Sequence, residues 1–554
     1  MNVRLDVLVP VGGDVELAAD VYLPDRGGPW PTALCRTPYD RQDERYVGWA
    51  VRFVGAGYAA VIEDCRGRYA SGGEWVPYVN EQADGAATFR WLAEQDFCDG
   101  NIGMFGISYV GFVQSLAATN GMEQLKAVVP TASQEDNFGH VWTDGVLQLE
   151  NLVNLGFYVG RRTMHASAAR HLDLGGVYRT LPLSDALDGM VPTETYREFL
   201  EHSTFDEFWR AYSLKGRYGQ IKAPALLITG WYDNLLLEQF KLLTGWRTGA
   251  DSAVARRASR IVIGPWSHFG LGERGCAEVD FGPEAARDLP ELHVDFYDRF
   301  LRGEVEDDPL PATFEIFVMG ENVWRGEDRW PPTYVTPTKF FLHSEGAANS
   351  CEGDGRLATD APGRERADSF RYDPHDPVPT VGGPCMLEAN TGPRDRSAVG
   401  RRADVLCYDS DPLRVPLEVT GPVDAVIFAA TTAIDTDFTA TLVDVDREGV
   451  ARTICEGIVR ARYRNSVEDP QPIVPNEVCA YRISLWSTSC VFAVGHRLRL
   501  EISSSNFPRF DRNLNTGERI AAATRSHVAS QTIRHDAQHP SHVVLPIRER
   551  PDLQ

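Results

Sequence analysis

The 554-residue sequence lacks the usual signals of a metal, disulfide or nucleic-acid-binding protein. Its ten cysteines include no CxxC pair and no Cys/His spacing typical of a zinc site, so we expect buried, reduced thiols and no bound metal. No run of Lys and Arg forms a basic stripe, and 55 basic against 78 acidic residues give a net charge of -23. We therefore expect no nucleic-acid partner.

Long apolar segments are also missing. The N-terminus, MNVRLDVLVP, has no basic stretch followed by an apolar one, and no apolar run approaches the length needed to cross a membrane. There is no internal repeat and no low-complexity segment, and the composition of 43% hydrophobic and 24% charged residues is that of a folded globular protein. We expect a soluble cytoplasmic protein without a membrane partner, divided into roughly two to four domains by its length.

In the first half of the chain, strand-like and helix-like segments alternate. Alternating apolar residues on both sides of Gly12 and Gly13 predict an N-terminal hairpin. Short apolar runs separated by helical periodicity then indicate a mostly parallel sheet covered on both faces, an α/β fold. These runs are 32–35, 59–62, 102–105, 127–129, 225–228 and 261–263.

Two segments depart from this alternation. Residues 139–221 lack strand-like runs and contain amphipathic, aromatic-rich stretches, which predicts a helical cap inserted into the core. Beyond about residue 334, regularly spaced strands without helices between them indicate a β-sandwich of jelly-roll type. The predicted domains are the core at 1–138 and 222–333, the cap at 139–221, and the sandwich at 334–554.

The stretch GMFGISYVGF, residues 103–112, follows a predicted strand and precedes a predicted helix. A sharp turn between the two would expose the hydroxyl of Ser108 above the sheet as a nucleophile, because nearby glycines permit strained backbone angles. Val110 stands where glycine is usual in the GxSxG motif. The alternative is a glycine-rich turn with an incidental serine.

A serine hydroxyl needs a base and a group that orients the base. The predicted strand at 225–228 runs into Asp233, and the one at 261–263 runs into His268. Both loops leave the carboxyl ends of parallel strands, where such sheets place their ligands, and serine, acid and base follow in the expected order. Asp233 could instead cap the next helix, and His268 could be an ordinary loop histidine.

The negative oxygen formed in acyl transfer needs two preorganised donors. The backbone N–H of Tyr109, the residue after the nucleophile, is the first. Pro38, in the loop after an early strand, has no N–H, so we expect the phenol of the adjacent Tyr39 to be the second. A buried tyrosine with a purely structural role is the alternative.

Apolar residues beside these loops are candidates for the substrate pocket. Aromatic side chains are common both in ligand sites and in protein cores. A position in the pocket and a position in the core therefore remain equally open for each aromatic candidate. The aromatic candidates are Trp142, Trp231, Trp266 and Phe269, and Leu235 is a further candidate because it lies just after Asp233.

The motifs RTPYDR, EDCRGRYASGGEW, GMFGISYVGF, TGWYDN, GPWSH, FYDRFLRGE, FVMGENVWR, DTDFTATLVDV and SSSNFPRFDRN occur in this order. Together they resemble the cocaine esterase and X-prolyl dipeptidyl peptidase family of serine hydrolases over essentially the whole chain. The resemblance implies an α/β-hydrolase core, a cap and a C-terminal jelly roll. It also implies a triad of Ser108, Asp233 and His268, and an oxyanion hole of Tyr39 and Tyr109. The likeness is weak in the cap, and Leu235 replaces an aromatic that contacts a benzoyl substrate.

We therefore expect an enzyme that cleaves a carboxylic ester of a small organic molecule through an acyl-serine, with no cofactor. Three alternatives remain open. The first is an aminopeptidase or β-lactam acylase, the second an acyltransferase that uses the same acyl-serine, and the third a catalytically silent binding protein. A homodimer is compatible with all of them.

Overall fold

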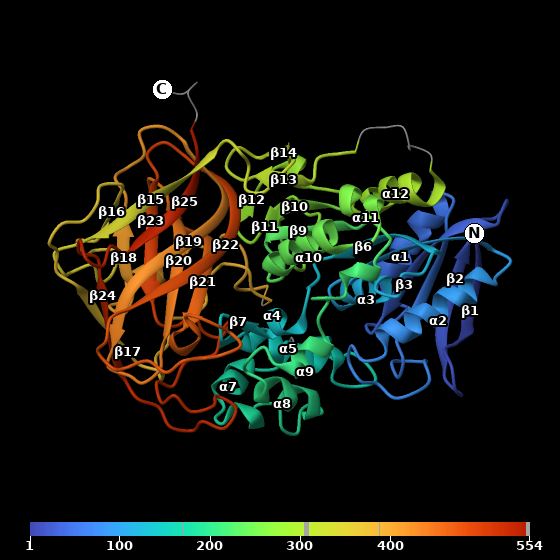
Figure 1. Ribbon diagram of the computed structural model, residues 1–554, viewed down its shortest axis with the longest axis horizontal. Helices are drawn as coiled ribbons and strands as arrows, with labels where there is room; N and C mark the ends of the chain where they lie inside the picture. Colours follow the sequence, from blue (N-terminus) through green and yellow to red (C-terminus); the bar gives the residue numbers. More distant parts are fainter. Residues whose placement is uncertain (170, 304–309, 387, 550–554) are drawn as a thin grey trace.

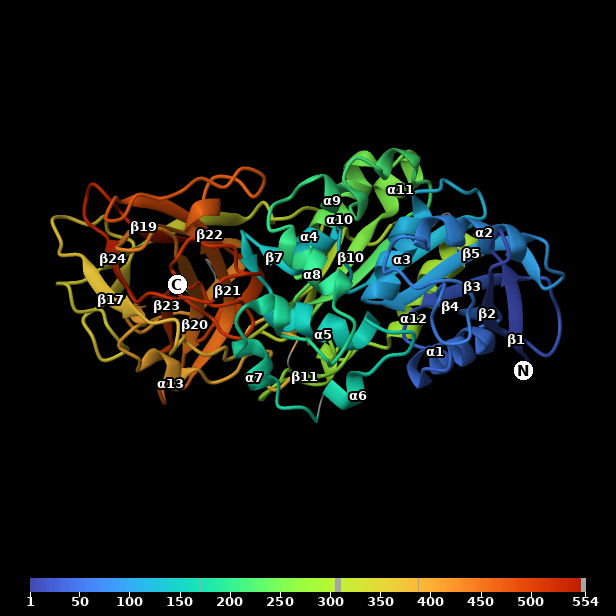
Figure 2. The same ribbon diagram turned by 90° about the horizontal axis from the view of Figure 1, so that it is seen from below.

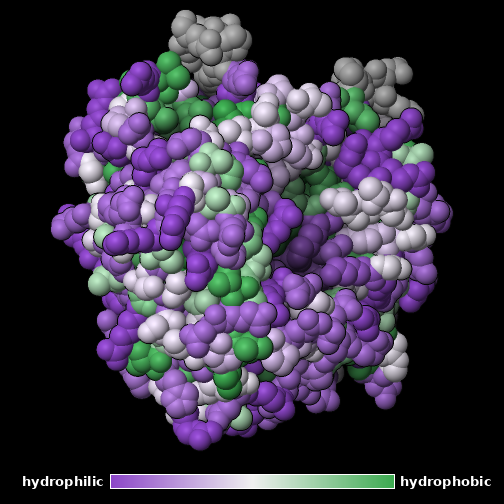
Figure 3. Space-filling view, turned by 60° about the vertical axis from the view of Figure 1, so that its left-hand side comes forward, coloured by the Kyte–Doolittle hydropathy of each residue, from purple (hydrophilic) through white to green (hydrophobic). Residues whose placement is uncertain are grey.

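The computed structural model describes residues 1–169, 171–303, 310–386 and 388–549. Figure 1 shows an α/β half at one end, a β-rich half at the other, and a group of helices below the junction between them. Figure 3 shows a face that is mostly hydrophilic, with hydrophobic residues in separate spots and a hollow near its centre. Within the described ranges, no helix is both long enough and apolar enough to cross a bilayer.

The α/β half contains a ten-stranded sheet in the order β1-β2-β4-β3-β5-β6-β9-β10-β13-β14. Strands β4 to β13 along this order are parallel, whereas β1 and β2 at one edge and β14 at the other pair antiparallel with their neighbours. Every strand run predicted from the sequence overlaps a strand of this sheet, and the α/β fold class is confirmed. The strands are β1 (Asn2–Pro10), β2 (Glu16–Leu23), β3 (Trp30–Thr37), β4 (Ala59–Asp64), β5 (Cys98–Ile107), β6 (Leu125–Thr131), β9 (Leu226–Tyr232), β10 (Arg260–Ser267), β13 (Phe314–Val318) and β14 (Val323–Glu327).

The sequence pattern does not predict β13 and β14. Strand β14 forms the edge of the sheet and has no fully buried residue, so it carries no apolar run. Strand β13 is only five residues long, and Glu315 interrupts it after Phe314, which leaves an apolar run of Ile316 to Val318. Together they extend the sheet toward the β-rich half.

Helices cover both faces of this sheet because each carries an apolar side toward it. Residues of α1 and α12, such as Phe53 and Phe296, pack with Phe105 of β5 on one face. Residues of α2 and α3, such as Phe89 and Phe112, join the core on the other face. The helices are α1 (Glu44–Gly55), α2 (Glu81–Ala93), α3 (Tyr109–Ala118), α10 (Leu236–Gly249), α11 (Ala253–Ala258) and α12 (Leu289–Tyr297).

The segment between β6 and β9 consists mainly of short helices and lies across the junction of the two halves (Figure 2). Its longest helix, α5, contacts several of the others. A two-stranded hairpin, β7 (Trp142–Thr143) and β8 (Val146–Leu147), interrupts the predicted helical character. The helices are α4 (Asn137–Val141), α5 (Leu149–Val159), α6 (Ala166–Ala169), α7 (Leu174–Arg179), η1 (Leu183–Asp185), α8 (Glu194–Glu201), α9 (Glu207–Ala211) and η2 (Tyr218–Gln220).

The β-rich half forms the β-sandwich expected from its evenly spaced strands. Eleven strands take part in its sheet, and only the short segments α13 (Ser397–Gly400) and η5 (Ala461–Tyr463) are helical among the described residues. The strands are β15 (Val335–His343), β16 (Arg356–Ala358), β17 (Asp368–Tyr372), β18 (Leu406–Asp409), β19 (Leu417–Thr431), β20 (Asp437–Val445), β21 (Ala451–Arg460), β22 (Cys479–Phe492), β23 (Arg497–Ser503), β24 (Ala529–Arg534) and β25 (His542–Arg548).

Hydrogen bonds join the sandwich to the start of α5. The backbone N–H of Asp511 donates to the carbonyl of Leu147 at 2.9 Å, and the N–H of Leu147 donates to Asp511 Oδ1, also at 2.9 Å. The N–H of Glu150 donates to the carbonyl of Pro508 at 3.1 Å. Asp511 is itself held by the buried guanidinium of Arg460 at 2.8 Å. The position of α5 therefore depends on the β-rich half.

Candidate active site

Ser108 lies between the end of β5 and the first residue of α3, with φ 64° and ψ −123°. This is a sterically strained conformation for a residue with a side chain, and it turns the serine out of the sheet. Two glycines make the turn fit. A Cβ on Gly106 would come within 2.1 Å of Val110 Cγ1, and one on Gly111 within 2.7 Å of Ser133 Cβ. The bulk of Val110 is therefore accommodated by Gly106.

Asp233 and His268 follow the neighbouring parallel strands β9 and β10, so their loops lie side by side. His268 Nδ1 is 3.1 Å from Asp233 Oδ1. The same oxygen accepts the backbone N–H of Leu235 at 2.9 Å, which stabilises the turn into α10. Asp233 is fully buried and His268 is 5% exposed. With Nδ1–H directed at the carboxylate, the imidazole keeps Nε2 free to accept a proton.

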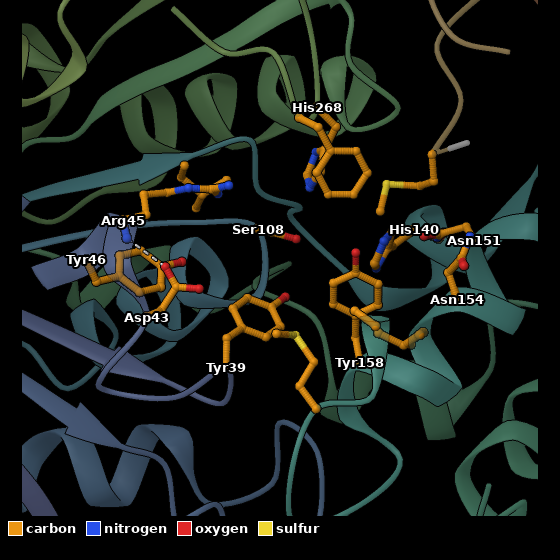
Figure 4. Close-up of a pocket in the computed structure, with 16 residues that line it drawn as sticks. Tyr39, Asp43, Arg45, Tyr46, Ser108, His140, Asn151, Asn154, Tyr158 and His268 are labelled. Carbon is orange, nitrogen blue, oxygen red and sulfur yellow. Dashed lines mark hydrogen bonds between the residues drawn. The ribbon is translucent and has the colours of Figure 1, made fainter. Parts of the chain in front are cut away.

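Ser108 and His268 both line one cavity, where Figure 4 shows them near each other. The phenol of Tyr39 points toward the serine in the same view. Burial raises the pKa of Tyr39 to about 12, although interactions with the Ser108 side chain and with the backbone amide of Tyr109 lower it. The hydroxyl of Tyr39 therefore stays protonated at neutral pH and lies beside the serine as a hydrogen-bond donor.

The side chain of Tyr109 points away from the cavity. Its hydroxyl donates to Glu81 Oε1 at 3.0 Å and accepts the backbone N–H of Tyr78 at 2.7 Å. Its ring stacks on that of Tyr78, with the centroids 4.4 Å apart. This leaves the backbone N–H of Tyr109, at the N-terminus of α3, as the part of the residue that faces Tyr39 and Ser108.

The cavity has a volume of about 140 Å³. Of the apolar residues predicted from the sequence to form the substrate pocket, its described wall includes Phe269. The complete wall is Tyr39, Asp43, Arg45, Tyr46, Ile107, Ser108, His140, Asn151, Asn154, Leu155, Tyr158, Met164, Ala166, His268, Phe269 and Met386.

The structure places the other four candidates elsewhere, in packed interior positions. The indole N–H groups of the three tryptophans donate to backbone carbonyls: Trp142 to Phe199 at 3.2 Å, Trp231 to Phe317 at 2.7 Å, and Trp266 to Glu273 at 2.8 Å. Leu235 is fully buried at the start of α10. All four side chains are buried, and none belongs to the described wall of this cavity.

Sequence reasoning missed the polar part of the wall. Asn151, Asn154 and Tyr158 are spaced three and four residues apart on α5 and thus share one helical face. Polar residues at this spacing within an apolar helix are the signal that could have identified them. His140, from α4, joins them in the cavity wall.

Two family models match the chain. The model for X-Pro dipeptidyl-peptidase (S15 family) matches residues 12–270, and the model for the X-Pro dipeptidyl-peptidase C-terminal non-catalytic domain matches residues 309–544. The first match contains Ser108, Asp233 and His268.

Among relatives, the cocaine esterase of Rhodococcus sp. (strain MB1 Bresler) is 39% identical, with 99% of each chain covered. A putative serine esterase of Mycobacterium bovis is 26% identical over 83% of this chain and 80% of its own. Among solved structures, an α-amino acid ester hydrolase has a TM-score of 0.85 and 25% identity, with 99% of this chain and 96% of that chain covered. The chain therefore belongs to the X-Pro dipeptidyl-peptidase (S15) family and is a serine hydrolase.

Proposed function

We propose that the protein is a carboxylesterase that cleaves an ester of a small organic molecule, with Ser108, His268 and Asp233 as its triad. The observation that carries this proposal is the position of the Tyr39 hydroxyl. It interacts with both the Ser108 side chain and the Tyr109 amide, and His268, paired to Asp233, lines the same cavity. A nucleophile, a base, an orienting acid and two oxyanion donors are thereby assembled around one space.

In the first half of the reaction, Ser108 Oγ attacks the ester carbonyl while His268 Nε2 takes its proton. The negative oxygen receives hydrogen bonds from the Tyr39 hydroxyl and the Tyr109 N–H. Asp233 stabilises the imidazolium that forms. The tetrahedral intermediate then breaks its bond to the alcohol oxygen, which takes the proton from His268, and the alcohol leaves an acyl-serine.

In the second half, a water molecule attacks the acyl carbon and transfers a proton to His268. The same two donors receive the negative oxygen. When this intermediate collapses, the bond to Ser108 Oγ breaks, His268 returns the proton to the serine, and the carboxylic acid is released. No group beyond the side chains, the backbone amide and water is needed.

The cavity favours esters over substrates with a free amine. An ammonium group needs carboxylates to receive it. In the described wall, Asp43 is the one carboxylate, and Arg45 of the same wall donates its backbone N–H to Asp43 Oδ1 at 2.9 Å. A positive guanidinium in the same wall weakens the attraction for an amine, so the aminopeptidase and amidase alternatives are less well supported.

Labelling with a fluorophosphonate tests the proposal, with Ser108→Ala as the control. Wild type should be labelled and should hydrolyse short nitrophenyl esters, and Ser108→Ala should do neither. Faster turnover of proline-containing dipeptide anilides would instead identify a peptidase, and transfer of the acyl group to an added alcohol or amine would identify an acyltransferase. A wild-type protein that is neither labelled nor active would refute the enzyme proposal.

We also propose the domain division 1–138 with 222–333, 139–221, and 334–554, a cytoplasmic location and a homodimer. All ten cysteines lie in the described part of the chain and are free thiols, which agrees with a reducing compartment. Cell fractionation tests the location, and light scattering on the purified protein tests the assembly. A secreted or strictly monomeric protein would contradict the respective proposal.

A further inference from the structure

Polar side chains from two helices line the side of the cavity that sequence reasoning missed. His140 comes from α4, and Asn151 and Asn154 come from α5. All three belong to the cavity wall together with Ser108 and His268. Figure 4 shows them grouped on one side of the serine, across the cavity from Asp43 and Arg45. We call His140 and Asn154 the amide–imidazole wall.

Both members of this wall are buried with hydrogen-bonding capacity left over. His140 is 6% exposed and Asn154 is 9% exposed. His140 Nδ1 has no hydrogen-bond partner in the part of the chain that the structure describes. The side-chain amide of Asn154 forms no hydrogen bond with any of the described residues. Buried polar atoms are almost always paired, so the unpaired amide of Asn154 in the cavity wall indicates an occupant that completes it. His140 Nδ1 is itself enclosed, and the imidazole belongs to the same wall.

The wall is held in place rather than loosely exposed. The side-chain nitrogen of Asn151 donates to the backbone carbonyl of His140 at 2.5 Å, which ties α4 to α5. Hydrogen bonds from the sandwich to Leu147 and Glu150 fix the first turn of α5. A ligand group would therefore meet preorganised partners, which gives hydrogen bonds their selectivity.

The wall carries no charge at neutral pH. Burial lowers the pKa of His140 to about 4, and the electrostatic interaction with His268 acts in the same direction, against smaller opposite effects of Asn151 and Asp233. The imidazole is therefore neutral, with one donor and one acceptor nitrogen. Asn154 is neutral as well. Neither residue attracts a carboxylate or an ammonium group by charge.

We propose that the amide–imidazole wall selects esters that carry an uncharged hydrogen-bonding group, a hydroxyl or a carbonyl, in addition to the ester that is cleaved. This inference rests on the proposed function, because it assigns the substrate class of the same site. It makes His140 and Asn154 specificity-determining residues. An apolar group of the same size leaves both of them unpaired, and the enzyme rejects it for that reason.

Two pairs of matched esters test the inference and show which part of the ester meets the wall. For the acyl part, the para-nitrophenyl ester of β-hydroxybutyrate is compared with that of isovalerate, in which a methyl replaces the hydroxyl. For the alcohol part, glycol monoacetate is compared with propyl acetate. In at least one pair, wild type should favour the hydroxyl-bearing ester by about tenfold or more in kcat/KM.

Variants then connect the preference to the wall. In His140→Phe and Asn154→Leu, the ratio within the selective pair should fall toward one. His140→Gln, which replaces the imidazole with another uncharged hydrogen-bonding group, should retain part of the preference. The exposed residues His171 and Asn465 provide matched controls. His171→Phe and Asn465→Leu should keep the wild-type ratio. A variant that is only destabilised loses both rates together and leaves the ratio unchanged.

The outcomes separate this inference from the proposed function. An enzyme that is labelled at Ser108 but shows a ratio near one in both pairs contradicts the inference and leaves the esterase proposal standing. The same conclusion follows if the wall variants keep the wild-type ratio, or if a labelled enzyme cleaves none of the four esters. Absence of labelling and of all hydrolysis would overturn both together.

Discussion

Oδ1 of Asp233 lies 3.1 Å from Nδ1 of His268, and the same oxygen accepts the backbone N–H of Leu235. One atom thus orients the proposed base and stabilises the turn that leads into α10. The sequence leaves two interpretations of Asp233 open, an orienting acid and the cap of the following helix. The N-cap of α10 is Leu235, so Asp233 stabilises the turn before this helix and does not cap it.

This shared oxygen makes Asp233→Asn a clean test of charge. Asparagine can place its carbonyl oxygen at the same position, so the turn and the imidazole orientation should survive while the negative charge is lost. We expect kcat to fall by at least about 100-fold with KM little changed, because the imidazolium formed during the reaction loses its partner. Steady-state kinetics and a denaturation curve measure the two effects. Asp251→Asn, at an exposed position, is the control, and a loss below about threefold in Asp233→Asn would argue against the triad.

Tyr39→Phe should remove one oxyanion donor and leave the ring in place. We expect kcat to fall by about 100- to 1000-fold with a small change in KM, since this hydrogen bond is made chiefly in the transition state. Kinetics on short nitrophenyl esters measure the loss. The half-exposed Tyr334 offers the matched control Tyr334→Phe. Near-wild-type turnover in Tyr39→Phe would mean that another group supplies the second donor.

Tyr109→Phe should lower stability more than turnover, the opposite of Tyr39→Phe, because the proposed oxyanion donor of Tyr109 is its amide and not its hydroxyl. The hydroxyl pairs with Glu81 and with the N–H of Tyr78 inside the protein. Removing it leaves the N–H of Tyr78 buried without its partner and takes one hydrogen bond from Glu81, which keeps its ion pair with Arg36. This should lower the free energy of unfolding by about 1–3 kcal/mol. Turnover should fall far less than in Tyr39→Phe. Urea denaturation measures the stability of the variant, and kinetics on the same preparation measure its turnover. A loss of turnover as large as that of Tyr39→Phe would indicate that the Tyr109 hydroxyl takes part in the reaction.

His293 should make the fold sensitive to acid. It is fully buried, and burial lowers its pKa from 6.5 to about 4, although its hydrogen bond to the carbonyl of Leu289 raises it. Between pH 6.5 and 4 the unfolded chain binds a proton at this residue that the folded chain does not. The stability that this residue contributes is therefore present above that window and lost as the pH falls through it, by up to roughly 3 kcal/mol.

The variant His293→Gln removes this titration while keeping a donor for Leu289. Its stability relative to wild type should improve as the pH is lowered from 7 to 4.5, measured as the difference between their denaturation midpoints. His171→Gln, on the exposed surface, should show no such trend. A difference between His293→Gln and wild type that does not change with pH would contradict the prediction.

The core fold and the candidate triad can be predicted from the sequence for a physical reason. Parallel strands buried on both faces appear as apolar runs, and the residues that follow them meet at one edge of the sheet. Asp233 and His268 can therefore be assigned to neighbouring loops without coordinates. The edge strand β14 cannot be found in this way, because an exposed strand carries no apolar run.

The cavity wall is harder to predict, because a position beside a strand end does not say which way a side chain points. Trp266 precedes His268 by two residues, yet its ring turns into the core and its nitrogen pairs with the carbonyl of Glu273. Phe269, on the other side of His268, faces the cavity. His140 and Asn154 become neighbours of the serine only through the packing of α4 and α5, and no local pattern encodes that packing.

The hydrogen bonds between Asp511 and Leu147 connect the β-sandwich to the segment that leads into α5. They set where α5 begins, and α5 supplies Asn151, Asn154 and Tyr158 to the space above the nucleophile. Exchanging the sandwich for that of a relative would thus retune which esters fit, although Met386 is the only described residue of that half in the cavity wall. Substitutions in the β-sandwich would then change the selectivity of the enzyme without altering the reacting groups.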